Sequence, residues 1–243
     1  MPHIYLAHPQ LIKEKIIIED LKKIHYLKDV LRLKPQDRIT LFDAQGIRYF
    51  CQIEGISSQR IILNIDKKIF GSNILPRITV AFALIKKTKI MDDLVDKFTQ
   101  LGVYRIIPTV TQRTIVNWSQ EKKIKQIERW QKVAISSSQQ SKRDFLPIIE
   151  EIKKIDEVIR EQVELKLIFT VSKETIPLKE LLDKKSTFKE VLVLIGPEGD
   201  FSLQEINQAK RAGFIPVSLG KLILRAETAS LAVVSFIRLY ADR

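Results

Sequence analysis

The chain has 243 residues, with 41 Lys and Arg against 29 Asp and Glu, and a formal net charge of +12. This length suits one large domain or two smaller ones, and the positive excess favours polyanions such as nucleic acids as partners. A merely solvated basic surface is the alternative. The single Cys51 excludes an intramolecular disulfide framework, and the three histidines have no spacing typical of a metal site.

Neither end of the hydropathy scale points to a membrane. No stretch approaches the roughly 18 apolar residues of a transmembrane helix. The amino terminus, MPHIYLAHPQ, lacks the basic and apolar regions of a secretory signal. We therefore expect a cytoplasmic protein with no membrane partner and no metal.

A small β-rich unit is predicted for residues 1–72. Asp20 is placed to cap a short helix. Strand candidates follow at short spacing over 15–18, 38–43, 49–53 and 60–65. The stretch Gly71-Ser72-Asn73 followed by Pro76 is typical of a linker, so a second domain is predicted over 73–243.

The second domain alternates strand and helix patterns, which is typical of a mostly parallel α/β sheet. Apolar strand candidates are followed by amphipathic helices that end at glycines or turns. The strands are expected over 78–84, 104–110, 165–171, 191–195 and 214–219, and the helices over 91–101, 124–134, 203–209 and 227–240.

The most informative stretch is residues 191–240. Five apolar residues predict a strand buried on both faces, and the loop Gly196-Pro197-Glu198-Gly199 breaks it at once. Ser202 with Glu205 forms a capping box for the next helix, and Gly213 is placed to end it.

A second glycine loop follows at Gly220, after the strand predicted over 214–219. Glycine loops at strand ends expose backbone groups to ligands in open α/β sheets, although two ordinary turns are the alternative. The patterns GxxxxGK[ST] and GxGxxG are missing from the sequence, which argues against NTPases and dehydrogenases. Residues 121–143 carry seven basic and two acidic side chains and form a plausible phosphate-contacting face.

Several motifs together resemble a known family. IGPEG, the capped helix and SLGKLILRAETA are similar to the carboxyl-terminal signature of the SPOUT methyltransferases, and among them to the RsmE family of ribosomal RNA uridine methyltransferases. DKFTQLGVYRIIPTVTQRT and RWQKVAISSSQQSKR resemble the family's middle segments. HYLKDVLRLKPQDRITLFDAQG resembles its PUA-like amino-terminal domain, so the resemblance covers nearly the whole chain.

The resemblance implies an α/β SPOUT domain with a mostly parallel sheet and a deep carboxyl-terminal trefoil knot, preceded by a small PUA-like β-barrel domain. It also implies a homodimer that uses S-adenosylmethionine to methylate N3 of a specific uridine in 16S ribosomal RNA of the assembled 30S particle. The apolar final helix is compatible with a dimer interface, but burial in the chain's own core explains it equally well.

The same resemblance assigns the site residues. Two walls of a cofactor pocket are expected, in which glycines admit the cofactor against the backbone and the apolar Leu222-Ile223-Leu224 run packs against adenine. Positive side chains on both domains are expected to contact RNA. The cofactor residues are Thr170, Ile195, Gly196, Pro197, Glu198, Gly199, Ser218, Leu219, Gly220, Leu222, Ile223 and Leu224, and the RNA-binding residues are Lys28, Arg32, Lys34, Lys97, Arg113 and Arg143.

Three residues are candidates for the chemistry at uracil N3. Arg225 is placed to stabilise the anion that forms when N3 loses its proton, and Glu227 or Glu198 is placed to accept that proton or to orient the base. The alternative is structural, because an acid at position 227 also stabilises the start of the final helix and could pair with Arg225.

Two positions depart from the family pattern. Asp200 stands where a glycine is usual, and Leu222 stands where an arginine is expected. Aspartate tolerates a left-handed backbone better than most residues, so the first change is compatible with the fold. The second removes a substrate or phosphate contact for which Lys221 could substitute. These departures leave a second function open, that of a non-catalytic RNA-binding or ribosome-assembly factor with a degenerate cofactor site.

Overall fold

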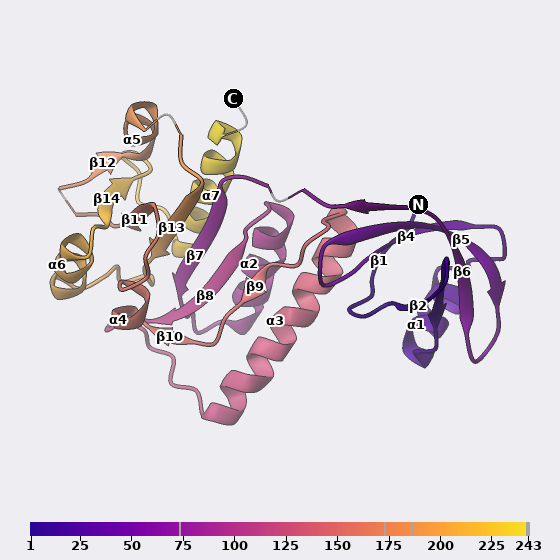
Figure 1. The fold of residues 1–243 in the computed structure, drawn as a ribbon. Coiled ribbons are helices and arrows are strands. Elements are labelled where there is room, and N and C mark those ends of the chain that lie inside the picture. The colour runs from indigo at the N-terminus through magenta and orange to yellow at the C-terminus, as the bar shows by residue number, and fades with distance from the viewer. Residues whose placement is uncertain (73, 173, 186, 242–243) are drawn as a thin grey trace. The chain divides into compact units, whose positions relative to one another are not determined.

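The computed structural model describes residues 1–72, 74–172, 174–185 and 187–241 (Figure 1). The chain divides into two compact units, Met1–Asn73 with Ser138–Leu146, and Ile74–Ser137 with Pro147–Arg243. The sequence predicted one boundary after residue 72. The structure adds a second crossing, because residues 138–146 return to the first unit. Asn73, the last residue of the expected linker, lies outside the described residues.

The first unit is a six-stranded sheet, as its spacing of short strands predicted. The pairing is antiparallel except between its first and fourth strands, and it follows the order β1-β4-β5-β6-β3-β2. Asp20 caps α1 (Leu21–His25) by accepting hydrogen bonds from the amides of Lys22 and Lys23, and the π-helical segment η1 (Tyr26–Val30) follows. The strands are β1 (His3–Tyr5), β2 (Gln10–Ile12), β3 (Lys15–Ile18), β4 (Arg38–Phe42), β5 (Ile47–Ile56) and β6 (Ile61–Phe70).

The segment Ser138–Leu146 joins this unit through long-range polar contacts. Arg48 Nε donates to Asp144 Oδ1 at 2.6 Å, and the two side chains form a largely shielded ion pair. His3 Nε2 donates to the main-chain oxygen of Arg143 at 2.8 Å. Because these partners lie about a hundred residues apart or more, no local pattern in the sequence could reveal the return.

Cys51, in the middle of β5, is buried in the core of the first unit. Its side chain is 1% exposed, and burial, reinforced by the nearby Asp66 carboxylate, raises the pKa of the thiol to about 12. Only the thiolate is a good nucleophile, so this thiol is held in its unreactive form.

Cys51 should therefore resist thiol reagents in the folded protein. At pH 8, we expect 5,5′-dithiobis(2-nitrobenzoic acid) to label the native chain at least ~100-fold more slowly than the chain unfolded in guanidinium chloride. The chain contains no other cysteine, so the signal reports this site alone. Rapid labelling of the native protein would contradict the burial of the thiol.

The second unit is built on a parallel sheet in the order β10-β8-β7-β13-β11-β14-β12, with β9 beside β8. Every strand pairing found in this sheet among the described residues is parallel, which confirms the predicted α/β class. The strands are β7 (Arg77–Ala83), β8 (Arg105–Val110), β9 (Ile148–Ile149), β10 (Lys153–Lys154), β11 (Leu165–Phe169), β12 (Ile176–Pro177), β13 (Glu190–Ile195) and β14 (Ile215–Ser218).

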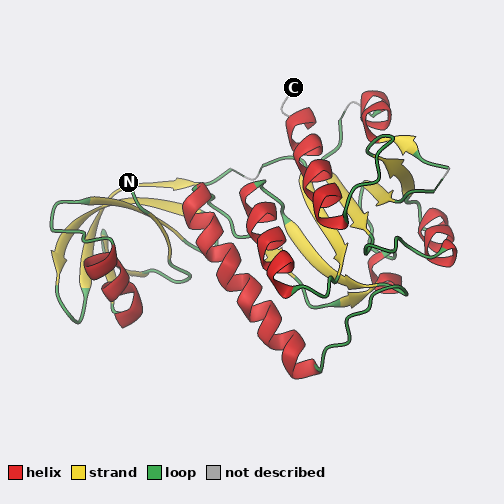
Figure 2. Ribbon diagram, turned by 180° about the vertical axis from the view of Figure 1, so that it is seen from behind, coloured by secondary structure: helices red, strands yellow, loops and turns green. Residues whose placement is uncertain are grey.

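Helices cover both faces of this sheet. Side chains from α2, α3, α5 and α7 share one apolar core, whereas those of α4 and α6 share the other. Figure 2 shows α2 and α7 side by side in front of the strands. The helices are α2 (Thr88–Gln100), α3 (Gln120–Ser141), α4 (Ile155–Val158), α5 (Leu178–Lys184), α6 (Leu203–Arg211) and α7 (Ala226–Ala241). The sequence missed the shortest elements, α4, α5, β9, β10 and β12, because they span too few residues for a period to emerge.

The final helix is fixed by a buried cation. Arg238, 9% exposed, donates from Nη1 to Leu75 O and from Nη2 to Gly102 O, both at 2.9 Å. These contacts hold the carboxyl half of α7 against the end of α2, and so anchor the helix whose first turn carries Glu227. Among the described residues, no helix combines the length and hydropathy needed to cross a bilayer.

Candidate active site

A cavity of about 750 Å³ lies where β11, β13 and β14 end. The three strands are neighbours and parallel, so their carboxyl ends open at one edge of the sheet, where such sheets bind ligands. Its walls are the loops that follow these strands and the first turns of α7. Both glycine loops predicted from the sequence contribute to it.

Two of the loop glycines are needed for different reasons. A Cβ on Gly196 would come within 3.1 Å of the Phe201 ring, so the turn after β13 is closely packed. Gly220 has space around it but a φ of +123°, which side-chain-bearing residues rarely adopt. The first glycine is thus selected by packing and the second by backbone conformation.

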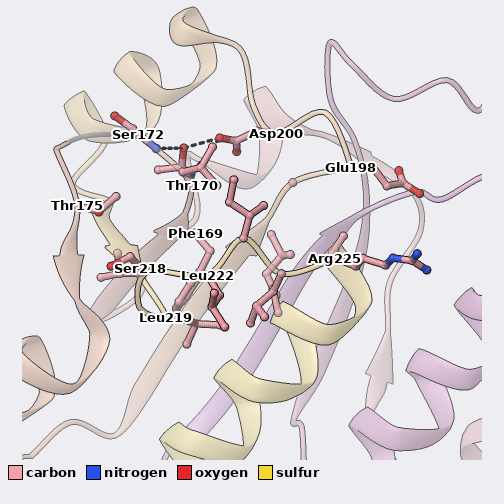
Figure 3. A pocket seen from close by; sticks show the side chains of 18 of the residues that line it. Phe169, Thr170, Ser172, Thr175, Glu198, Asp200, Ser218, Leu219, Leu222 and Arg225 are labelled. Atoms are coloured by element: carbon pink, nitrogen blue, oxygen red, sulfur yellow. Dashed lines mark hydrogen bonds between the residues drawn. The ribbon is translucent and has the colours of Figure 1, made fainter.

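Asp200 joins two walls of the cavity (Figure 3). Its backbone has φ +59°, which confirms the left-handed conformation expected at this position. Oδ2 of its carboxylate accepts hydrogen bonds from Thr170 Oγ1 at 2.8 Å and from the Val171 amide at 3.1 Å. Oδ1 accepts from the Phe201 amide at 2.8 Å. One side chain therefore ties the loop after β11 to the loop after β13.

Glu205 fixes the other side of the same loop. Its carboxylate accepts from the Ser202 amide at 2.8 Å, and Ser202 Oγ accepts from the Glu205 amide, which confirms the predicted capping box. The second carboxylate oxygen accepts from the Gln112 amide at 2.7 Å. Beside it, Arg113 Nη1 donates to Gly199 O at 2.5 Å. A local cap on α6 thus also fastens the loop that follows β8.

Two family models match the chain. The RNA methyltransferase domain matches residues 73–238, and the RNA methyltransferase PUA domain matches residues 18–66. The ribosomal RNA small subunit methyltransferase E of Buchnera aphidicola is 31% identical over 98% of this chain and 96% of that protein. The Rickettsia conorii protein of the same name is 30% identical over 97% of this chain and 94% of its own length.

The chain belongs to the ribosomal RNA small subunit methyltransferase E family. A crystal structure of the family member from Neisseria gonorrhoeae, bound to S-adenosyl methionine, matches the present structure with a TM-score of 0.85 and 29% sequence identity. The match covers 98% of this chain and 97% of that one. The family supplies both the PUA unit and the α/β unit that the sequence led us to expect.

All twelve residues predicted to bind the cofactor in this family member line the cavity, as does Arg225. Leu222 and Ile223 are each 81% exposed, so their apolar side chains are free to pack against a ligand. Lining residues missed by the sequence come from the same loops, and they are Phe169, Val171, Ser172, Thr175, Val217, Lys221, Ala226 and Ala229.

The predicted catalytic residues separate in the structure. Glu198 and Arg225 line the cavity, and Figure 3 shows both on the same side of it. Glu227 lies in the first turn of α7 and is absent from the cavity lining. Among the described residues, no ion pair joins Glu227 to Arg225, so the pairing considered as an alternative does not occur there.

The six predicted RNA contacts fall into separate groups. Lys28, Arg32 and Lys34 are exposed on or just after η1 in the first unit, and Arg143 belongs to the segment that returns to that unit. Arg113 lies beside the GPEG loop. Lys97 forms an ion pair with Asp93 near the end of α2, a helix that leads away from the carboxyl edge of the sheet.

Glu205 should support the fold around the site. Replacing it with Ala leaves two amides without partners, so we expect a loss of about 2–3 kcal/mol in the free energy of unfolding, measured with urea. Glu205→Gln, which keeps one acceptor oxygen, should lose less. Glu151→Ala, at an exposed position, serves as the control. Equal stability of Glu205→Ala and this control would refute the structural role.

Proposed function

We propose that this protein transfers the methyl group of S-adenosylmethionine to N3 of a specific uridine in 16S ribosomal RNA of the assembled small subunit. The single observation that carries the proposal is the cavity at the ends of β11, β13 and β14, lined by both glycine loops, in a member of the methyltransferase E family. The PUA unit supports RNA as the substrate.

The cavity fits the cofactor in size and chemistry. Its volume of about 750 Å³ lies within the range of small-molecule sites. Glycine backbone is open to close approach, and Leu222, Ile223 and Leu224 offer an apolar surface for a purine. Glu198 and Asp200 place negative charge in a wall that would face a sulfonium cation. When bound there, S-adenosylmethionine supplies the methyl group.

Arg225 and Glu198 supply the chemistry on the protein side. As the N–C bond forms and the methyl–sulfur bond breaks, the uracil must lose its N3 proton. The Glu198 carboxylate accepts that proton, and the Arg225 guanidinium stabilises the negative charge spread over the uracil carbonyls. Glu198 is preferred to Glu227 as the acceptor because it lines the cavity. Glu227 instead stabilises the amino end of α7, where an acid opposes the helix dipole.

The remaining partners are part of the same proposal. We propose a cytoplasmic homodimer with the family's carboxyl-terminal knot. The final helix offers less for a dimer than its sequence suggested, because Val233 and Ile237 are fully buried within the chain's own core. Phe236 and Tyr240 are only partly buried, and Leu239 is 70% exposed. A monomer mass in light scattering would contradict the dimer.

One observation favours a second candidate function. Leu222, which replaces the family's arginine, lies in the cavity wall and is highly exposed, so the site lacks one positive group. An RNA-binding assembly factor with a degenerate site would have the same fold. Such a factor would fail to bind S-adenosylhomocysteine even at millimolar concentration, whereas the proposed enzyme would bind it.

The decisive test is methyl transfer itself. Purified protein, labelled S-adenosylmethionine and small ribosomal subunits lacking their native modifications should yield labelled 3-methyluridine, identified by mass spectrometry of the nucleosides. Label in another nucleoside would refute the assignment to N3. No label, with binding to the subunits intact, would support the assembly factor.

Arg225→Ala tests the cationic role. We expect the turnover number to fall about 100-fold, because a charge that acts on the developing anion is lost, while the Kd for S-adenosylmethionine changes little. Arg225→Lys, which keeps the charge with different geometry, should recover part of the rate. Full turnover by Arg225→Ala with unchanged affinity for the subunits would show that the cation has no such role.

Asp200→Gly tests the link between the two cavity walls. Glycine adopts the positive φ without strain, so this substitution removes only the side-chain hydrogen bonds. We expect the Kd for S-adenosylmethionine to rise about fivefold, because the loop after β11 is no longer held in place before binding.

Thr170 provides the matched partner for this test. Thr170→Val removes the donor of the same contact and should cost as much as Asp200→Gly, whereas Thr170→Ser keeps the hydroxyl and should bind normally. Because both changes break one interaction, the double variant Asp200→Gly/Thr170→Val should bind about as well as either single variant. Additive losses would mean that the two residues act separately.

A further inference from the structure

The loop between β7 and α2 carries three lysines with no assigned role. Lys86, Lys87 and Lys89 are all exposed. Within the described part of the chain, no hydrogen bond or ion pair occupies any of their ammonium groups. Four consecutive residues of this loop therefore present three uncompensated positive charges to solvent.

The register of the sheet places this loop beside the active site. Phe82 of β7 lies opposite Pro108 of β8 on one side and Ile195 of β13 on the other, in parallel pairings. Lys86 follows Phe82 by four residues, Arg113 follows Pro108 by five, and Gly199 follows Ile195 by four. The lysine loop, Arg113 and the GPEG loop therefore leave the sheet at the same edge and in adjacent positions.

The acidic side chains nearest in sequence do not neutralise these lysines. Asp92, in the second turn of α2, forms an ion pair with Arg129 at 2.7 Å and accepts a hydrogen bond from Gln126. Asp93 is paired with Lys97. Both carboxylates are thus engaged by cations on helices, and the loop keeps its full positive charge.

The cavity and the lysine loop lie on opposite sides of the GPEG loop. The cavity belongs to β11, β13 and β14, whereas the lysines follow β7, on the other flank of β13. Arg113, which follows β8, reaches the GPEG loop through its bond to Gly199. Figure 3 shows Arg225 and Glu198 turned toward one side of the cavity, away from Thr170 and Ser218. A base presented to these two residues would carry its flanking phosphates over the rim of the site.

We propose that Lys86, Lys87 and Lys89 bind backbone phosphates of the RNA strand that presents the target base to the cavity. The inference rests on the proposed function. An enzyme that acts on a base must take it out of its stack, and contacts to the flanking backbone hold the strand in register while the base enters the site. Three lysines in one exposed loop supply such contacts without reading sequence.

The test compares two pairs of substitutions with equal charge. Lys86→Gln/Lys89→Gln removes two charges at the carboxyl edge. Lys185→Gln/Lys189→Gln removes two exposed charges just before β13, at the amino edge of the same sheet. Both variants keep the same net charge, so long-range attraction to RNA changes equally. The readouts are the KM for small ribosomal subunits, the salt dependence of binding to them, and the Kd for S-adenosylmethionine.

We expect Lys86→Gln/Lys89→Gln to raise the KM for subunits about tenfold and to lower the slope of log affinity against log salt by about 1.5. The control pair should change KM less than about twofold. The Kd for S-adenosylmethionine should be unchanged in both variants, because the lysines lie outside the cavity.

Two results would overturn the inference. Equal effects of the two pairs would show that the loop acts only through net charge. A weaker Kd for S-adenosylmethionine in the carboxyl-edge pair, matching its loss of activity, would assign the loop to support of the cofactor cavity instead. If the unsubstituted protein transfers no methyl group and binds no subunits, the proposed function fails as a whole, which is a separate outcome.

Discussion

The structure depends on one strand that is buried on both faces. Residues 191, 193 and 195 of β13 pack into the core shared with α2, α3, α5 and α7, and residues 192 and 194 pack into the core shared with α4 and α6. The same strand pairs with β7 on one edge and β11 on the other. Because every side chain and backbone edge of β13 is engaged, the position where its chain leaves the sheet is rigidly fixed.

That rigidity is passed on to the active site by a few polar side chains. The turn after β13 is held from one side by Asp200, which binds the loop after β11, and from the other by Glu205 and Arg113, which bind the loop after β8. Loops from three strands are thereby fixed in relation to one another, as an enzyme that works by positioning requires. The division of labour follows the strand order, with the cofactor on one flank of β13 and positive charge on the other.

The aspartate at position 200 illustrates how a departure from a family pattern can be absorbed. A glycine there needs no contacts to adopt a positive φ, whereas aspartate accepts the conformation at some cost and recovers it through three hydrogen bonds. The change adds a link between two walls without filling the cavity. Leu222 has no comparable compensation among its contacts, and nothing in the structure explains its replacement of an arginine.

The sequence by itself determined the α/β class, the buried strand, the caps at Asp20 and Ser202, and the glycine loops, because each is encoded by residues within a few positions of one another. It also brought all twelve predicted cofactor residues to one cavity, since strand ends in a parallel sheet share an edge. Only the tertiary structure decided that Glu227 lies outside that cavity, that residues 138–146 return to the first unit, and that Lys86 leaves the sheet beside Gly199. Those outcomes depend on strand order and on contacts between residues far apart in the chain, which no local period records.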